Sequence, residues 1–493
     1  MKVDHKITGD VTVRDVLTAF PSLETVFARH GLAGCGGPNG PEEPIGFFAL
    51  VHRVDAQALI KELNQELARG RAQSAQAQPR PPQQRVYRPF LIASLAVALT
   101  MGFTTGTVLL LTAVLGLPAG SWWLTHAETH GSAQLFGWAG LFTMGIAYHV
   151  VPRFRGGELA FPRLVLPSLV LVAAAVVGRG LSQGFSQHPW GAALLISSGV
   201  GLLLGMGLFA AIVSRTLRAS SRRHEPFEPW LLAGVAWAVV AAVLQLAVLG
   251  MMVTDGSIVA RPALNAAFLH AALFGFLVNA IIGVSVRVLP AFLHLPAPRT
   301  TAITAAAWLF NAGLAWQVAA WTWEAGPRWW AGGALIQVTG MVLVTFGLGP
   351  FRRGRPQAGQ SAAAYKGFGL FVRSAYVWFA IAGGLLLYLA LGDLVQWQAR
   401  EISLSVARHA VALGVVTMMI MGMAARVLPV FEGKRLQSPR LMDTAFVLLT
   451  ASVALRTAFS LTSVPASRAL LGLSGVAGLA AVVLFAIVVA RTL

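Results

Sequence analysis

Long apolar segments separated by short polar connections fill the chain from residue 90 to its C-terminus. Each segment has about 20 or more residues, which is enough to cross a hydrocarbon core of about 30 Å as an α-helix. We expect twelve spans, beginning near Phe90, Trp122, Leu164, Trp190, Trp230, Pro262, Thr300, Trp329, Ser374, Ile402, Leu441 and Arg468. The pattern predicts an all-α polytopic membrane protein.

Composition and charge support this class. Hydrophobic residues make up 56% of the 493 residues and charged residues 11%, so too little polar surface is available to cover a water-soluble globule. In a soluble protein the net charge of +18 would suggest a nucleic-acid partner. Here the basic clusters fall on alternate connections, which the positive-inside rule assigns to the cytoplasm. They are Arg85/Arg88, Arg153/Arg155/Arg163, Arg215/Arg218/Arg222/Arg223, Arg352/Arg353/Arg355 and Lys434/Arg435/Arg440. We therefore expect both termini in the cytoplasm and no nucleic-acid partner.

The segment before the first span reads differently from the rest. We expect a small soluble helical domain over residues 1–68, a basic flexible linker over 69–89 and the membrane domain over 90–493. The Arg/Gln/Ala/Pro composition of the linker cannot bury a core, and its charge favours anionic lipid headgroups. Short helices are expected over Thr12–Phe20, Leu23–His30, Glu43–His52 and Ala56–Leu67. One cysteine, Cys35, cannot form an internal disulfide framework, and no apolar signal sequence precedes the domain.

Three segments at the ends of the second, sixth and tenth spans align without a gap. They are "LFGWAGLFTMGIAYHVVPRF", "LFGFLVNAIIGVSVRVLPAF" and "VALGVVTMMIMGMAARVLPVF". The offsets between Gly137, Gly275 and Gly414 are 138 and 139 residues, the length of one set of four spans. We predict three four-helix repeats, about 90–228, 229–367 and 368–493, arranged with threefold pseudosymmetry. The glycines indicate close packing of these spans at the centre.

A second set of equivalent positions in the repeat includes charged residues inside the spans. Arg179 of the third span aligns with Gln317 of the seventh and Arg456 of the eleventh. Charged residues within apolar spans are costly and usually face a cavity or a partner. Helix packing does not explain two arginines at one depth, so we expect an anionic group beside them.

Histidines on the three inner spans are the candidate ligands. His130, His270 and His409 lie about a third of the way in from the outer face, and imidazole is a common ligand of haem iron and copper. His270 and His409 precede the aligned glycine by five residues, whereas His130 stands two residues before the matching Ser132. Two residues turn a helix by about 200°. His130 therefore shares a space with one of the other two, which predicts a pair and a singleton.

The pair could hold a haem through both axial positions, with Arg179 or Arg456 bonded to its propionates. The singleton suits a second metal or a ligand pocket. His126, one helical turn outward of His130, is a candidate further metal ligand or supporting partner. At the cytoplasmic ends His149 aligns with Arg287 and Arg426, and we interpret these three mainly as snorkelling, topology-setting residues. We do not count these three residues among the candidate metal ligands.

The segments "RHAVALGVVTMMIMGMAARVLPVFEGKRL", "AFLHAALFGFLVNAIIGVSVRVLPAF" and "THAETHGSAQLFGWAGLF" resemble NnrS-type proteins, haem- and copper-containing membrane proteins tied to nitric oxide stress in denitrifying bacteria. The resemblance covers about residues 90–493. It implies a bacterial inner-membrane protein with haem b, a candidate copper or other second metal, and nitric oxide as partner.

The plan also resembles subunit I of the haem-copper oxidases and nitric oxide reductases, whose low-spin haem lies between helices two and ten. The resemblance implies His130 and His409 as the haem pair, and His270 at the place of the copper or non-haem iron ligand. Those enzymes carry a second histidine on helix ten and a pair on helix seven. Residues 300–324 contain no histidine, so a complete binuclear centre lacks its ligands.

The N-terminal "FPSLETVFARHGLAGCGG" resembles the small helical domain of Ric/ScdA-type iron-sulfur cluster repair proteins. The resemblance implies thiol chemistry at Cys35 with nitric oxide or a partner's cluster; those proteins commonly have two cysteines here, so an incidental thiol is the alternative. An electron donor or iron-sulfur protein is the corresponding partner.

Three functions remain open. The favoured one is a haem-binding membrane protein that binds, responds to or detoxifies nitric oxide. The second is a divergent oxidase or reductase, an oxidoreductase acting on nitric oxide or oxygen, with catalytic residues that the sequence leaves unknown. The third is a cofactor-free anion transporter, although its threefold repeat differs from the common twofold transporter repeats.

Overall fold

The computed structural model describes residues 6–30, 43–70, 85–219, 224–354, 365–396, 404–459 and 467–493. Twelve helical segments in these residues are long and apolar enough to cross a membrane, which confirms the predicted all-α polytopic fold. The spans run over Tyr87–Val114, Ser121–Arg155, Pro162–Phe185, Pro189–Arg218, Glu228–Thr254, Pro262–Phe292, Thr300–Thr322, Pro327–Leu348, Phe368–Leu394, Leu404–Glu432, Pro439–Ala458 and Ala469–Thr492. The ninth span begins six residues before its expected start at Ser374. The reason is that the helix continues through Arg373, whose side chain is exposed.

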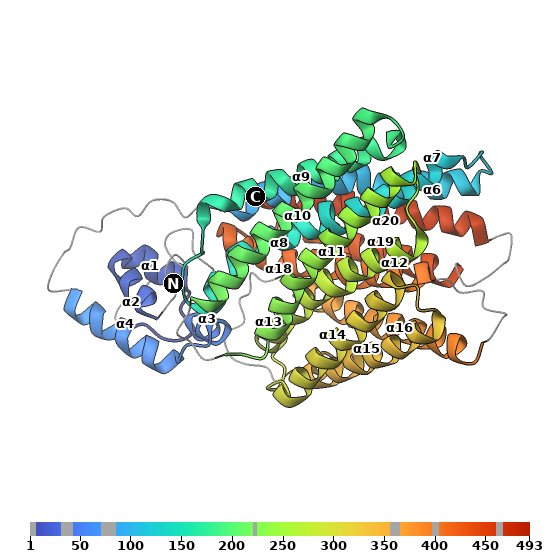
Figure 1. The fold of residues 1–493 in the computed structure, drawn as a ribbon. Helices are drawn as coiled ribbons and strands as arrows, with labels where there is room; N and C mark the ends of the chain where they lie inside the picture. Colours follow the sequence, from blue (N-terminus) through green and yellow to red (C-terminus); the bar gives the residue numbers. More distant parts are fainter. Residues whose placement is uncertain are drawn as a thin grey trace.

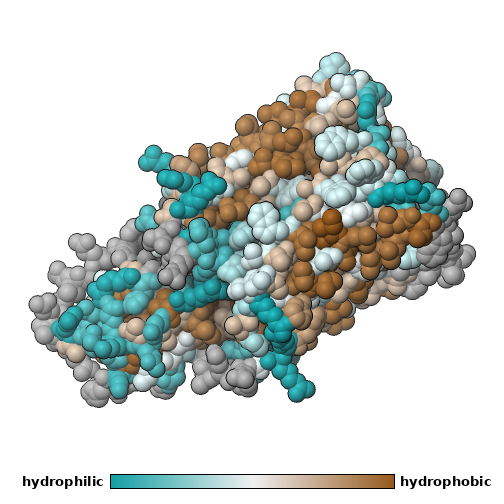
Figure 2. Space-filling view, turned by 60° about the horizontal axis from the view of Figure 1, so that its bottom comes forward, coloured by the Kyte–Doolittle hydropathy of each residue, from teal (hydrophilic) through white to brown (hydrophobic). Residues whose placement is uncertain are grey.

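The spans are built from the following helices (Figure 1). They are α5 (Tyr87–Val97), η2 (Ala98–Gly102), α6 (Phe103–Val114), α7 (Ser121–Ser132), η3 (Ala133–Gly140), α8 (Leu141–Arg155), η4 (Pro162–Leu164), α9 (Val165–Ser182), η5 (Gln183–Phe185), α10 (Pro189–Arg218), α11 (Glu228–Thr254), α12 (Pro262–His270), η6 (Ala271–Val278), α13 (Asn279–Phe292), α14 (Thr300–Thr322), α15 (Pro327–Leu348), α16 (Phe368–Leu394), α17 (Leu404–His409), η7 (Ala410–Thr417), α18 (Met418–Glu432), α19 (Pro439–Phe459) and α20 (Ser467–Thr492). Brown hydrophobic side chains cover much of the flank of the bundle, whereas teal side chains gather on the small N-terminal helices (Figure 2). That distribution suits a lipid-facing flank.

The second, sixth and tenth spans form the centre of the bundle. In each, 78% of the most apolar window is buried, compared with 33–56% in the other spans. Each of the three also changes to a π-helical segment at the same place, η3, η6 and η7. Single π-helical turns are uncommon and cluster at functional sites. The threefold symmetry predicted from the aligned segments agrees with these features and stays a prediction.

The aligned glycines explain how the inner spans pack. A Cβ at Gly137 would lie 2.4 Å from Val97 Cγ1, one at Gly275 2.6 Å from Trp237 Cγ, and one at Gly414 2.4 Å from Trp378 Cγ. These partners belong to the first, fifth and ninth spans. Because no side chain fits at these distances, each inner span approaches its neighbour more closely than any other residue would permit.

Four short helices precede the membrane spans, close to the expected positions. They are α1 (Val13–Ala19), α2 (Glu24–Arg29), α3 (Ile45–His52) and α4 (Ala56–Gly70), with η1 (Pro21–Leu23) between the first two. Their hydrophobic core, which includes Val16, Phe27 and Leu63, is separate from that of the bundle. The 1–68, 69–89 and 90–493 division stays a prediction, and Cys35 and residues 71–84 of the linker lie outside the described residues.

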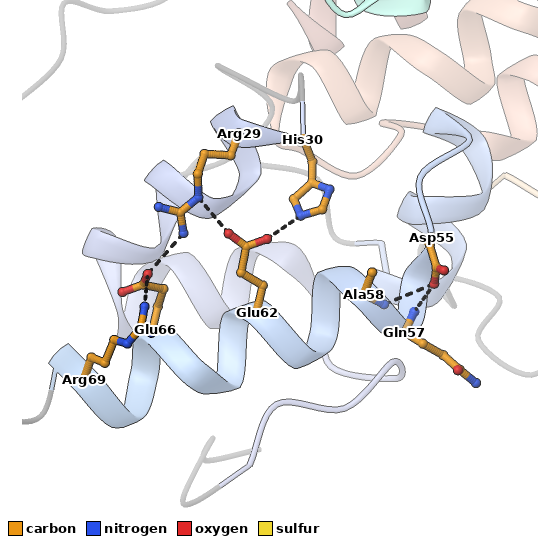
Figure 3. A network of polar contacts seen from close by, with 8 residues as sticks. All are labelled: Arg29, His30, Asp55, Gln57, Ala58, Glu62, Glu66 and Arg69. Atoms are coloured by element: carbon orange, nitrogen blue, oxygen red, sulfur yellow. Dashed lines mark hydrogen bonds and ion pairs between the residues drawn. The ribbon is translucent and has the colours of Figure 1, made fainter.

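Polar contacts fix α2 against α4 (Figure 3). Glu62 of α4 bonds His30 at 2.7 Å and Arg29 at 2.7 Å, and Glu66 bonds Arg29 and Arg69. The hydrogen bond with His30 lowers the pKa of the Glu62 carboxyl below its usual value, and the charge of Arg29 adds to this effect. Since these groups are partly exposed, each pair adds about 0–1 kcal/mol to stability.

The N-terminal helices dock on one end of the bundle through Arg426 of α18. Its Nη2 donates to Glu43 Oε1 at 2.6 Å, and both side chains are buried. The guanidinium also lies over the ring of Phe292, 4.8 Å from its centroid, and Phe47 of α3 stacks on Phe292 at 6.5 Å. The tenth and sixth spans therefore share one contact with the N-terminal domain.

Arg287 of α13 makes a second contact on the same face. Its Nη1 donates to the backbone oxygen of Val51 at 2.9 Å, and its Nε lies 3.6 Å from Glu225, which also pairs with Arg53. The C-terminus lies on this face too, because Arg88 at the start of the first span bonds the backbone oxygen of Leu493. Both ends of the chain are thus on one side; that this side is the cytoplasm stays a prediction.

These contacts correct the interpretation of Arg287 and Arg426 as snorkelling residues. Their exposed fractions are 3% and 5%, so neither side chain reaches solvent. His149 at the aligned position is 6% exposed and packs between the rings of Tyr87 and Phe431. For Arg287 and Arg426 the cause is the docked N-terminal domain, which supplies partners that the span sequences alone do not reveal. For His149 the cause is packing against the first and tenth spans.

Replacing Glu43 with glutamine should loosen the docked domain. Glu43→Gln removes the charge that the buried Arg426 is paired with, and breaking a buried pair costs about 3–5 kcal/mol. We expect amide hydrogen exchange in α3 to speed up at least tenfold. Glu66→Gln, which removes a half-exposed pair within the N-terminal domain, is the control and should leave α3 unchanged. Equal exchange in both variants would contradict the docking contact.

Candidate functional site

The structure brings His130, His409 and Arg456 together. His130 lies in α7 of the second span, His409 in α17 of the tenth and Arg456 in α19 of the eleventh. The two imidazoles interact electrostatically with each other, and Arg456 interacts with both. All three side chains are deep in protein yet keep part of their surface accessible. The predicted pair is therefore His130 with His409.

Both imidazoles are oriented by a backbone carbonyl. His130 Nδ1 lies 2.9 Å from the oxygen of Gly102, and His409 Nδ1 lies 2.8 Å from the oxygen of Ser405. Because a carbonyl only accepts, Nδ1 carries the proton in each neutral ring and Nε2 keeps its lone pair. No described residue bonds either Nε2. Metal-binding histidines are held in this way, so the donor chemistry of the two residues would fit a haem iron.

Two glycines of the first span seat the ring of His130. Gly102 closes the π-helical segment η2 with φ −87° and ψ −106°, outside the helical range, and its carbonyl meets His130. A Cβ at Gly106 would lie 2.7 Å from His130 Cε1, so any larger residue would displace the imidazole. The sequence "MGFTTGT" contains both glycines, but only the fold links them to the histidine.

Arg179 has different neighbours. Its Nε donates to Gln183 Oε1 at 3.0 Å, and its guanidinium lies 5.5 Å from the ring centroid of Phe268. Gln183 Nε2 donates in turn to Glu128 at 2.6 Å. None of the contacts described for Arg179 involves His130 or His409. Of the two arginines predicted to meet haem propionates, Arg456 is the one beside the histidines.

His270 lies in a third cluster and is fully buried. Its Nε2 is 3.3 Å from Gln337 Oε1, which also accepts from Gln317 Nε2 at 2.7 Å. The centroid of its ring lies 5.1 Å from that of Trp321 and 4.4 Å from that of Phe274. The neighbours that contact His270 include no thiolate, carboxylate or second imidazole, and no group of three or more such side chains occurs in the described residues. These residues do not fit a copper site.

His126 and Glu128 border the first cluster on α7. His126 is exposed, and its Nδ1 lies 2.7 Å from the backbone oxygen of Trp122, one turn earlier on the same helix. Its role as a further ligand stays a prediction. Glu128 accepts hydrogen bonds from Gln183 and from the backbone nitrogen of Ala260, so it belongs with Arg179.

Sequence reasoning missed three polar residues of these clusters. Gln183 follows Arg179 by four residues, a spacing that places both on one helix face. Gln337 lies on the eighth span, where no repeat position pointed to it. Arg408 directly precedes His409, lies 5.8 Å from the ring centroid of Trp321, and donates to the backbone oxygen of Ala266. It thereby links the His270 cluster to the tenth span.

Comparison with known proteins identifies one related family. A family model described as cytochrome c and quinol oxidase polypeptide I matches residues 85–466. The matched stretch begins just before α5 and contains the first eleven spans, so it includes all three clusters. No individual curated protein matches the chain.

The bond between Gln337 and His270 should contribute to stability. Gln337→Leu leaves the buried His270 Nε2 without its partner, and such a loss costs about 1–3 kcal/mol. We expect a lower thermal unfolding temperature in detergent. Thr339→Val on the exposed face of the same helix is the control and should shift it little. Equal unfolding temperatures for wild type and Gln337→Leu would contradict a stabilising role for this hydrogen bond.

Proposed function

Because the chain belongs to the cytochrome c and quinol oxidase polypeptide I family, matched over residues 85–466, we propose that it binds one haem between His130 and His409 and uses it to bind nitric oxide. The observation that carries the proposal is the pair of imidazoles on different spans, each with Nδ1 bonded to a carbonyl and Nε2 left for a metal. Haem b is the form we propose, since a chain with one cysteine lacks the C-x-x-C-H attachment motif.

The chain's own residues have three tasks in this proposal. A haem held here supplies an iron centre that carries electrons and binds diatomic gases. His130 of the second span and His409 of the tenth would hold it. Arg456, which interacts with both histidines, offsets the negative charge of carboxylates brought into an apolar bundle. Gly102 and Gly106 keep the ring of His130 in place.

Nitric oxide is proposed because the quoted segments of the second, sixth and tenth spans resemble NnrS-type proteins. Of the two imidazoles, His409 is the one suited to give way to a gas. Its Nδ1 bonds a carbonyl within its own helix, whereas His130 is bonded to another span and wedged against Gly106. His409 is therefore held by its own helix alone, whereas His130 is also held by the first span.

An enzyme that reduces nitric oxide or oxygen is the second candidate, and family membership is what favours it. The cluster around His270 opposes it, because glutamines from the seventh and eighth spans occupy the surroundings of the only histidine there. Consumption of nitric oxide by the purified protein with an artificial electron donor would establish the enzyme; binding without consumption supports the favoured function.

The N-terminal domain is proposed to receive an electron donor or an iron-sulfur protein. Its resemblance to Ric/ScdA-type domains supports the kind of partner. Its docking through Arg426 and Arg287 supports a link to the spans that hold His409 and His270.

Absorption spectra of the purified protein test the haem site. We expect a sharp reduced α-band in the wild type and in His270→Ala, and its loss in His130→Ala and His409→Ala. His188→Ala, in an exposed connection, is the control. Anaerobic addition of nitric oxide to the wild type should give a saturable spectral shift. Absence of haem from protein made with adequate haem supply, or an α-band retained in both alanine variants, would overturn the proposal.

Gly106→Ala tests the seat of His130 without removing a ligand. The added methyl would lie 2.7 Å from the imidazole, so the ring must move, and functional groups tolerate only about 0.5 Å of displacement. We expect haem content to fall severalfold. Gly384→Ala has open space around its Cβ and should keep full haem content. Wild-type haem content and band position in Gly106→Ala would contradict this geometry.

A further inference from the structure

Arg179 presents a buried cation whose bonding is incomplete. Its exposed fraction is 0%, yet neither Nη1 nor Nη2 has a hydrogen-bond partner in the described structure. Only Nε is bonded, to Gln183. Leaving donors of a charged group unmet in an apolar bundle costs more than leaving a neutral donor unmet. The two terminal nitrogens therefore indicate a ligand that accepts two hydrogen bonds side by side.

The nearby carboxylate does not fill this role. Glu128 is attracted to Arg179, but the guanidinium reaches it only through Gln183, whose Nε2 donates to Glu128 Oε2 at 2.6 Å. Both oxygens of Glu128 also lie close to the backbone nitrogen of Ala260, at 3.1 and 3.2 Å. Glu128 fixes Gln183, and Gln183 fixes the Nε edge of Arg179. The opposite edge of the guanidinium is held in place without being bonded.

The surroundings of Arg179 offer no metal ligand of the kind found near Arg456. By the repeat offsets that align Arg456 with Arg179, the positions of His409 and His130 correspond to Ser132 and Phe268. Phe268 lies against the guanidinium at 5.5 Å, and Ser132 donates to Gln245 Oε1 at 3.1 Å. The arginine is kept while both imidazoles are replaced, so an anion without a metal suits this place.

We propose that Arg179 binds a small planar oxyanion with two adjacent oxygens, of the class of nitrite and formate. The parallel Nη1 and Nη2 donors match two such oxygens as a bidentate pair. A larger anion is disfavoured, because Phe268 and Gln183 beside the guanidinium are also fully buried. The site lies beneath the connection over residues 255–261, since Gln183 bonds the oxygen of Ile258 and Glu128 bonds Ala260. The site therefore lies toward the end of the bundle away from the N-terminal domain. This site does not depend on the haem.

Anion binding to the purified full-length protein tests the site. Titration with nitrite and with formate, followed calorimetrically, should show one saturable site per chain in the wild type, and chloride at the same concentration should not compete. In Arg179→Gln, which places the residue of the aligned Gln317, affinity should fall at least tenfold. Arg163→Gln, which replaces an exposed arginine in the first turn of the same span, should bind as the wild type does. No saturable binding in the wild type, or equal binding by chloride, means that only water meets Arg179 and overturns the proposal.

Haem content of the same samples separates this site from the haem site. Arg179→Gln should keep the wild-type absorption spectrum, because its partners are not those of His130 and His409. Loss of haem in this variant would assign Arg179 to the cofactor and overturn the anion site. Arg179→Lys guards against misfolding, since it retains the charge but not the paired donors; it should fold, keep haem and bind nitrite and formate at least tenfold more weakly. Nitrite affinity unchanged in Arg179→Lys would contradict bidentate recognition.

Discussion

Polar side chains buried among lipid-facing helices must find their partners inside the bundle, and this constraint organises the protein. Three clusters meet it in three ways. His130 and His409 each bond a backbone carbonyl through Nδ1, and no described residue bonds either Nε2. His270 joins a pair of glutamines. Arg179 is held from one edge, through Gln183. Aligned glycines let the inner spans approach their neighbours closely enough for such contacts to form. The three polar clusters therefore have different partners within one all-helical bundle.

The difference among the clusters comes from small departures from the repeat. His130 stands two residues before the position of His270 and His409, which turns it into the space that His409 also faces. The first span completes that space, because Gly102 supplies the carbonyl and Gly106 leaves room for the ring. At the corresponding places of the other two spaces no second histidine is present. One pair of inner-span histidines, rather than three, follows from that asymmetry.

Much of the fold could be predicted from the lengths of the hydrophobic segments. Twelve spans and the central position of three of them could be predicted, since hydrophobic runs and aligned glycines are local in sequence. Helical rotation predicted that His130 shares a space with one of the other two histidines. The choice of His409 as that partner was implied by the resemblance to the haem-copper oxidases, not by the rotation. Contacts that depend on distant segments could not be predicted: Gln337 beside His270, Gly106 beside His130, and above all the docked N-terminal domain that buries Arg426 and changes its role from snorkelling to pairing with Glu43. An arginine at the end of a span has the same sequence pattern whether it faces lipid headgroups or a docked domain, so the sequence alone does not distinguish the two.

Family membership places the chain among haem-copper oxidase subunits, while the glutamines around His270 set it apart from a complete binuclear centre. The proposed cofactor is therefore a single haem with two histidine ligands from the second and tenth spans. Electron paramagnetic resonance of the oxidised protein, with haem quantified on the same sample, tests it most directly. We expect about one haem per chain and a low-spin ferric signal typical of two imidazole ligands. A purely high-spin signal, two haems per chain, or no haem at all would contradict it.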